Sequence, residues 1–252
     1  MGKLWLSYVR RSVERTEIFW TMTFTQHFNS ATLLKKKIID DKLCFLEFKV
    51  ENWKGHIPGQ YSEICLTAEN GYQAIRPYSI ASTPQKDTVS FLIEKIDEGE
   101  VSNFLYDYSL AGDKFQISNP IGLRFILHNI KTPIFIASGS GIAPFLSMSK
   151  YLQEKKISFF TYHWSRNITG LINFDENFLR LNKYYFPFIT REIPVGWKGG
   201  IERIKEENFN NLDINQGYEI YICGSDSFVE KALSVISNLN LDSEIYTERF
   251  GS

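Results

Sequence analysis

The sequence has few cysteines, no long apolar run and almost no net charge. Its 252 residues include three cysteines, Cys44, Cys65 and Cys223, and an odd, widely spaced set argues against a disulfide framework. It favours a reducing compartment, so we expect a cytoplasmic protein. An iron–sulfur cluster typically takes four cysteines, so we expect none here. The four histidines form no spaced pair typical of zinc, and no metal site is predicted.

Charge and hydropathy exclude further classes of protein. The formal charge of −1 gives no overall field that would favour nucleic acid or an acidic membrane surface. No apolar run approaches the roughly 20 residues of a membrane span, so no integral membrane segment is expected. With 43% hydrophobic and 15% aromatic residues, the chain can fill a sizeable core, and its length allows one large domain or two.

Residues 1–30 differ from the rest of the chain. Arginines alternate with apolar residues, but Glu14 and Glu17 weaken an interpretation as a transit peptide, and the apolar part is too short for a secretory signal. We predict a poorly ordered leader, with an amphipathic surface helix as the alternative.

Residues 31–127 have the pattern of an antiparallel β-barrel. The alternation is clearest at 43–50, where Cys44, Leu46 and Phe48 share one face. Short strands separated by turn signals are typical of a barrel or sandwich. The predicted strands are 32–39, 43–50, 60–67, 75–80, 88–93 and 114–118, with a short helix beginning at Gly99.

Residues 131–252 alternate strands with helices after Pro133. Such alternation predicts a parallel, doubly wound sheet. The predicted strands are 134–137, 157–162, 185–190, 218–223 and 244–248, with helices after Gly141 and at 226–239. The expected fold is therefore a two-domain one, a β-barrel followed by an α/β domain.

The stretch Arg76-Pro77-Tyr78-Ser79 places a cation, an aromatic ring and a hydroxyl on consecutive residues. The Arg fork suits a phosphate, the Tyr ring suits stacking, and the Ser hydroxyl suits a polar ring edge. Pro77 lacks a ladder donor, which predicts a sheet edge or a break. Taken alone, the stretch is more typical of an ordinary edge strand with an exposed Arg and a half-buried Tyr.

A second motif joins a predicted strand to a helix. In Gly139-Ser140-Gly141 the glycines allow the backbone to approach a pyrophosphate, and the helix start offers free N–H donors. Pro144 is acceptable in the first helical turn. Cys223-Gly224 follows another strand, at the carboxyl edge that lines the ligand crevice in such sheets, although a free cysteine is more often a small core residue.

Together these motifs resemble the ferredoxin–NADP reductase superfamily, which includes flavodoxin reductases, oxygenase reductase components and flavin reductases. The likeness covers residues 31–252. It rests on RPYS at 76–79, GEVS at 99–102, GSGIAP at 139–144, CG at 223–224 and ERF at 248–250. The resemblance implies FAD in residues 31–127 and NADPH, or alternatively NADH, in residues 131–252.

The resemblance also implies a role for individual residues. Arg76 would bind the flavin pyrophosphate, Tyr78 would pack on the isoalloxazine, and Phe250 would cover the flavin face that nicotinamide later occupies. Catalytic roles would fall to Ser79 near the flavin N5, Cys223 near the hydride-donating carbon, and Glu248 in proton delivery. The full predicted cofactor-binding set is Arg76, Pro77, Tyr78, Ser79, Ile93, Lys95, Gly99, Val101, Ser102, Gly139, Ser140, Gly141, Pro144, Ser165, Arg166, Arg191, Cys223, Gly224 and Phe250.

The preference between nicotinamides depends on residues after the second and third strands of the α/β half. Enzymes that prefer NADH commonly place an acid about 20 residues past the glycine turn, and the end of this strand, His163-Trp164-Ser165-Arg166, has none. We therefore expect NADPH, with Arg191 as the main discriminator and Ser165 or Arg166 assisting. Both arginines could instead be solvated loop charges, and Glu192 could neutralise its neighbour.

The electron acceptor implied by the resemblance is a separate carrier such as ferredoxin or flavodoxin, or an oxygenase component. One alternative is a flavin reductase that uses flavin as a substrate. Another is a redox-inactive binding subunit with the same fold. The retention of the RPYS, GSGIAP and CG motifs argues against this last alternative.

Overall fold

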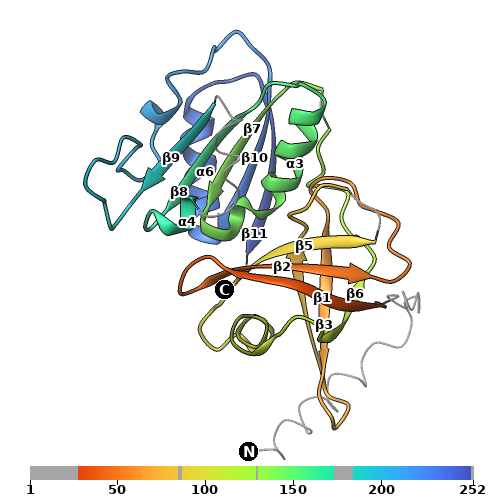
Figure 1. Cartoon of the computed structure of the whole chain (residues 1–252). Helices are drawn as coiled ribbons and strands as arrows, with labels where there is room; N and C mark the ends of the chain where they lie inside the picture. The colour runs from red at the N-terminus through yellow and green to blue at the C-terminus, as the bar shows by residue number, and fades with distance from the viewer. Residues whose placement is uncertain (1–27, 85–86, 129, 173–183, 251–252) are drawn as a thin grey trace, which may run out of the picture.

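The computed structural model describes residues 28–84, 87–128, 130–172 and 184–250. Of the predicted leader, residues 1–27 lie outside this described part, and residues 28–30 already belong to the first strand. The chain forms two sheets that lie one above the other in Figure 1.

The first sheet is an antiparallel barrel. Its order is β4-β3-β6-β1-β2-β5, and an isolated bridge between Ile80 and Phe91 links the two ends of this order. The bridge closes the sheet, and the predicted barrel is confirmed. The strands are β1 (Phe28–Ile38), β2 (Leu43–Val50), β3 (Tyr61–Thr67), β4 (Gln73–Ser79), β5 (Thr88–Glu94) and β6 (Lys114–Ser118).

The alternating residues of β2 explain why the barrel has an interior. Cys44, Leu46 and Phe48 are fully buried in the barrel core, as their period of two predicted. Between β5 and β6, helix α2 (Glu100–Asn103) continues into a π-helix, η1 (Phe104–Tyr108). This helical segment closes one side of the core with Val101 and Leu105.

The second sheet is parallel throughout, in the order β11-β10-β7-β8-β9. Figure 1 shows helices α3 and α6 on opposite faces of it, so the predicted doubly wound architecture is confirmed. The strands are β7 (Thr132–Ser138), β8 (Phe160–Ser165), β9 (Tyr185–Ile189), β10 (Tyr218–Ser225) and β11 (Ser243–Phe250). The helical elements are η2 (Gly139–Ile142), α3 (Ala143–Glu154), α4 (Thr169–Ile172), η3 (Glu206–Phe209) and α6 (Asp226–Asn238).

Strand β8 begins at Phe160, three residues later than the predicted 157–162. The backbone N–H of Ile157 donates to Leu152 O and completes the end of α3, after Lys156 has adopted a positive φ of 58°. The apolar run therefore begins in the connection that closes the helix and not in the strand. At its other end the strand extends to Ser165, so Arg166 is the first residue beyond it.

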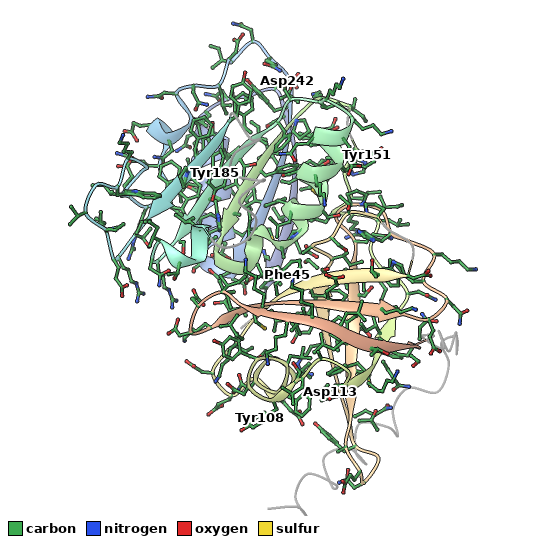
Figure 2. All side chains as sticks on the ribbon, in the orientation of Figure 1. Phe45, Tyr108, Asp113, Tyr151, Tyr185 and Asp242 are labelled. Atoms are coloured by element: carbon green, nitrogen blue, oxygen red, sulfur yellow. The ribbon has the colours of Figure 1, made fainter. Side chains whose placement is uncertain are left out.

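The two sheets share part of their core. Ile39, Leu43, Leu92 and Phe125 pack in one cluster with residues of β7, α3 and β10. Figure 2 shows Phe45 of β2 at this junction, and its side chain packs against the same cluster. Within the described ranges, no helix is both long and apolar enough to cross a membrane.

Candidate functional site at the junction of the two sheets

The three predicted catalytic residues meet where β4 of the barrel reaches the ends of β10 and β11. Ser79, the last residue of β4, donates its hydroxyl to Glu248 Oε2 at 3.2 Å, although 169 residues separate them. Cys223 lies opposite Glu248 in the parallel register of β10 and β11. The structure therefore brings a hydroxyl, a carboxyl and a thiol into one place.

Burial controls the ionisation of this group. Removal from water raises the pKa of Glu248 to about 7, while the hydrogen bond from Ser79 lowers it by a smaller amount. Burial, with the charge of Glu248 as a second cause, holds the pKa of the Cys223 thiol well above its usual range. Cys223 is therefore a neutral thiol at physiological pH, whereas Glu248 takes up and releases a proton near neutrality.

Arg76, Pro77 and Tyr78 lead into this junction along β4. Arg76 and Pro77 are exposed, and β4 pairs only with β3 as a strand at the end of the sheet order, which agrees with the edge predicted from Pro77. The guanidinium of Arg76 donates to Ile75 O at 2.7 Å and has no ion pair among the described residues. Tyr78 is half-buried against the barrel core, and burial raises the pKa of its phenol.

The GEVS segment forms a tight turn at the start of α2. A Cβ on Gly99 would lie 2.4 Å from both Ile96 Cγ1 and Ser102 Oγ, so any larger residue would force these two side chains to move. The hydroxyl of Ser102 is buried, donates to Gly99 O at 3.5 Å and accepts from Ile96 N at 3.4 Å. Val101 lies in the barrel core. The structure therefore commits the Ser102 hydroxyl to the turn itself, and a phosphate here would have to rely on backbone donors.

Two other predicted cofactor residues of the barrel are engaged elsewhere. The side chain of Ile93 is fully buried in the core. Lys95 forms an ion pair with Asp107 at 2.7 Å and lies 5.4 Å from the centre of the Tyr106 ring. Neither side chain is brought to the meeting point of Ser79 and Glu248.

The glycine turn between β7 and α3 packs directly against the end of β10. Gly139 has a φ of +55°, and a Cβ on Gly141 would lie 2.3 Å from the carbonyl oxygen of Cys223. Only a residue without a side chain fits so close to Cys223-Gly224. Pro144 occupies the first turn of α3, as predicted, and no side chain caps the first turn. The donor set and the lack of side-chain bulk fit a dinucleotide phosphate.

His163 supports the glycine turn and was missed by the sequence analysis. Its Nε2 lies 3.1 Å from Gly139 O, and its Nδ1 lies 3.0 Å from the Tyr185 hydroxyl. Complete burial lowers the pKa of this histidine to about 4, so the ring is neutral. Its place at the carboxyl end of a buried strand was the available signal, because that edge of a parallel sheet faces the ligand crevice.

Arg166 and Arg191 lie beside each other at the ends of β8 and β9. The backbone N–H of Arg191 donates to Arg166 O at 3.1 Å, and both side chains are exposed. Ser165 is half-buried, and its carbonyl accepts from Thr190 N at 3.0 Å. An open pocket of about 260 Å³ adjoins the pair, lined by Asn167, Ile168, Thr169, Glu192, Ile193 and Pro194.

Phe250 ends β11 opposite Ser225 and is half-buried against the core that the two sheets share. It is the last residue that the structure describes. Its strand carries Glu248 two positions earlier, so Phe250 lies at the same edge of the sheet as the Ser79–Glu248 contact.

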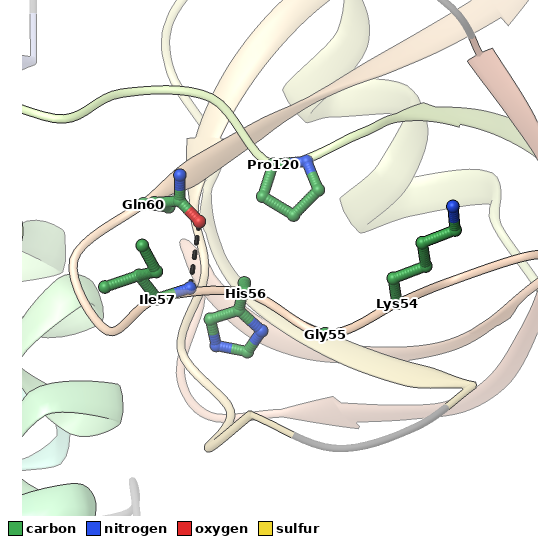
Figure 3. A pocket seen from close by; sticks show the side chains of 6 residues that line it. All are labelled: Lys54, Gly55, His56, Ile57, Gln60 and Pro120. Carbon is green, nitrogen blue, oxygen red and sulfur yellow. Dashed lines mark hydrogen bonds between the residues drawn. The ribbon is translucent and has the colours of Figure 1, made fainter.

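A larger open pocket, of about 380 Å³, lies beside the loop that precedes β3 (Figure 3). Gln60 accepts from Ile57 N at 2.8 Å there, and His56 lines the wall. His56 Nε2 lies 2.9 Å from Ser82 O and 3.3 Å from Ser147 Oγ of α3. This histidine therefore connects the barrel with the α/β half, and none of the predicted site residues lines the pocket.

The comparisons with known proteins agree with this architecture. Residues 30–125 match the family model of the oxidoreductase FAD-binding domain, and residues 135–233 match that of the oxidoreductase NAD-binding domain. The chain belongs to the ferredoxin–NADP reductase superfamily. It is thus an oxidoreductase with FAD- and NAD-binding domains, as the motifs predicted.

A curated relative and two solved structures illustrate the likeness of this superfamily member. The chain is 27% identical over 203 residues to the 2-halobenzoate 1,2-dioxygenase electron transfer component of Burkholderia cepacia, covering 77% of the chain but only 58% of that relative. A ferredoxin NADP+ reductase from Neisseria gonorrhoeae, solved with bound FAD and NADP, matches with a TM-score of 0.74 and 22% identity over 88% of this chain and 98% of that one. The FAD/NAD-binding domain of a Vibrio cholerae nitric oxide dioxygenase matches with a TM-score of 0.79 and 18% identity. This match covers 89% of this chain and 99% of that one. These structural likenesses show the fold.

Proposed function

We propose that this reductase takes a hydride from NADPH onto FAD and passes electrons singly to a separate carrier protein such as ferredoxin or flavodoxin. The observation that carries the proposal is the contact between Ser79 and Glu248, which joins the RPYS strand of the barrel to the carboxyl edge of the nucleotide-binding sheet. When bound, FAD supplies the change from two-electron to one-electron transfer.

The residues of the chain bind, orient and supply protons. Arg76 holds the flavin phosphates, since its guanidinium is exposed and has no ion pair among the described residues. Tyr78 and Phe250 enclose the ring system. Glu248, with a pKa of about 7, exchanges protons through the Ser79 hydroxyl.

Each of the two halves of the chain is assigned one cofactor. We propose that residues 31–127 hold FAD and that residues 131–252 hold the nicotinamide nucleotide, with the glycine turn and Cys223-Gly224 beside its reactive end. Arg166 and Arg191 are the candidate contacts for a 2′-phosphate, which a pair of exposed guanidinium groups is well suited to bind.

A second candidate function is the reductase component of an oxygenase. The chain is 27% identical to a dioxygenase electron transfer component and spans 58% of the length of that relative, which supports this candidate. In both cases the acceptor is a partner protein. The buried, free cysteines of the described chain agree with a reducing compartment, and we propose the cytoplasm, which cell fractionation would test.

The decisive experiment is an absorbance spectrum of the purified protein after gel filtration, followed by anaerobic titration with NADPH and NADH. We expect a yellow protein with stoichiometric FAD that NADPH bleaches, and whose electrons then reduce ferredoxin or flavodoxin. A colourless protein that turns over added flavin would support a flavin reductase instead. A protein that neither binds flavin nor oxidises NADPH would overturn the proposal.

A further inference from the structure

A carboxylate of the barrel lies against the glycine turn of the other half. Glu94 is the last residue of β5, and its Oε2 accepts a hydrogen bond from Ser140 Oγ at 2.5 Å. A Cβ added to Gly139 would lie 3.9 Å from the same oxygen. The charged group therefore faces the first two residues of the turn, where the phosphates of a dinucleotide are expected.

Glu94 has no cationic partner in the part of the chain that the structure describes. The neighbouring Lys95 pairs instead with Asp107 at 2.7 Å, and Lys42 lies 3.9 Å from Asp97. The turn itself contributes no acidic residue, and no side chain caps the first turn of η2 or α3. A carboxylate of the barrel thus lies next to a turn whose backbone N–H groups are not capped by any side chain of the described chain.

We propose that Glu94 competes with the nucleotide phosphates for the glycine turn and so limits the affinity of the protein for dinucleotides. The inference rests on the proposed function, in which this turn receives the nucleotide. The Ser140 hydroxyl has one proton to donate, and it can serve either the Glu94 carboxylate or a phosphate oxygen. A dinucleotide must therefore displace Glu94, and it does so against the repulsion between like charges.

The competition makes the nucleotide bind less tightly and leave more readily. Without the carboxylate of Glu94, Ser140 and the backbone of the turn would hold the phosphates with no negative charge from this residue nearby. Glu94 is half-buried, so its charge is less screened than that of an exposed surface carboxylate. Its removal is therefore expected to have a larger effect than the loss of an exposed acid.

The test is isothermal titration calorimetry of NADP+ binding to wild type and to variants, a readout that needs no turnover. Glu94→Gln keeps an acceptor for Ser140 and removes the charge, and Glu94→Ala removes both. We expect each to lower Kd roughly tenfold, which corresponds to about 1.4 kcal/mol. Glu94→Asp keeps the charge but is too short for the contact, and it should change Kd by less than about threefold.

Asp97→Asn is the matched control, because it changes the net charge by the same amount at an exposed position three residues away. If it tightens binding as much as Glu94→Gln, the effect is one of overall charge and the inference fails. It fails equally if Glu94→Gln and Glu94→Ala leave Kd unchanged or raise it, or if Glu94→Asp tightens binding as strongly. If NADP+ binds to none of the proteins, the nucleotide assignment of the proposed function fails as well, whereas normal binding without a Glu94 effect removes only this inference.

Discussion

Glu248 is a half-buried carboxyl whose ionisation should be visible in the stability of the protein. Its pKa is raised from 4.5 to about 7 in the folded state, so the folded protein binds more protons than the unfolded chain between these values. Stability is then lost as pH rises through this window, by up to about 3 kcal/mol. Glu248→Gln should therefore be more stable than wild type at pH 8, with a difference that shrinks towards pH 4.5. Thermal unfolding at both pH values checks this, and a difference independent of pH would contradict it.

Arg76 is exposed on β4, and its guanidinium donates a hydrogen bond to the carbonyl of the preceding residue, Ile75. We expect Arg76→Ala to fold as stably as wild type but to lose FAD, because a charge-assisted contact with phosphate contributes roughly 1.5–3 kcal/mol. FAD content after dialysis and the melting temperature of the apoprotein measure the two effects. Arg203→Ala removes another exposed arginine, on the α/β half, and should change neither. Full retention of FAD by Arg76→Ala would leave Arg76 as a surface residue.

Cys223 offers a neutral thiol at the end of β10. We expect Cys223→Ala to bind FAD normally but to be reduced more slowly by NADPH, because the side chain lies at the nucleotide edge and not beside the predicted flavin phosphates. Anaerobic stopped-flow absorbance measures the rate. Cys65→Ala is the control, since Cys65 is equally buried but belongs to β3 of the barrel. Equal reduction rates in the two variants would remove Cys223 from the site.

At the scale of elements, the ends of β8 and β9 form one unit through the bond from Arg191 N to Arg166 O. This unit should set the preference for NADPH over NADH. We expect Arg191→Ala to lower kcat/KM for NADPH by roughly tenfold or more while leaving that for NADH nearly unchanged, because only NADPH carries the 2′-phosphate. The measurement is kcat/KM for NADPH and for NADH in wild type and Arg191→Ala, with Arg203→Ala as the control. A wild-type preference for NADH, or an unchanged ratio of the two kcat/KM values in Arg191→Ala, would show that the assignment to Arg191 is wrong.

The elements themselves were largely predictable because local rules fix them. The alternation of β2, the helical spacing of α6 and the first-turn position of Pro144 all follow from residues close in sequence. The predicted start of β8 was wrong, because an apolar residue such as Ile157 can belong to the end of a helix as well as to a strand. The contacts of Ser79 with Glu248, Glu94 with Ser140 and His163 with Gly139 could not be predicted, since each depends on how separate elements pack.

For the whole molecule, the shared core implies that the two halves unfold together. Phe125 lies just after the last strand of the barrel, but its ring packs on the other half. Its ring centre is 5.9 Å from that of Phe145 on α3 and 5.7 Å from that of Tyr221 on β10. Two side chains of β10 also accept hydrogen bonds from the connecting segment: Glu219 Oε1 accepts from Ile130 N at 2.7 Å, and the Tyr221 hydroxyl accepts from His128 N at 3.0 Å. Contacts of this kind make the folding of one half depend on the other.

We therefore expect wild type to show one cooperative calorimetric transition, and Phe125→Ala to show two. The substitution removes about 3–5 kcal/mol of packing, and much of this belongs to the interface between the halves. Phe48→Ala removes a ring of the same size from the barrel interior, which is bounded by Phe91 and Phe115, and should lower the melting temperature without splitting the transition. Differential scanning calorimetry of the three proteins at equal FAD occupancy distinguishes these outcomes. Two resolved transitions in wild type would mean that the shared cluster does not couple the halves, and the Ser79–Glu248 contact would then be lost with whichever half unfolds first.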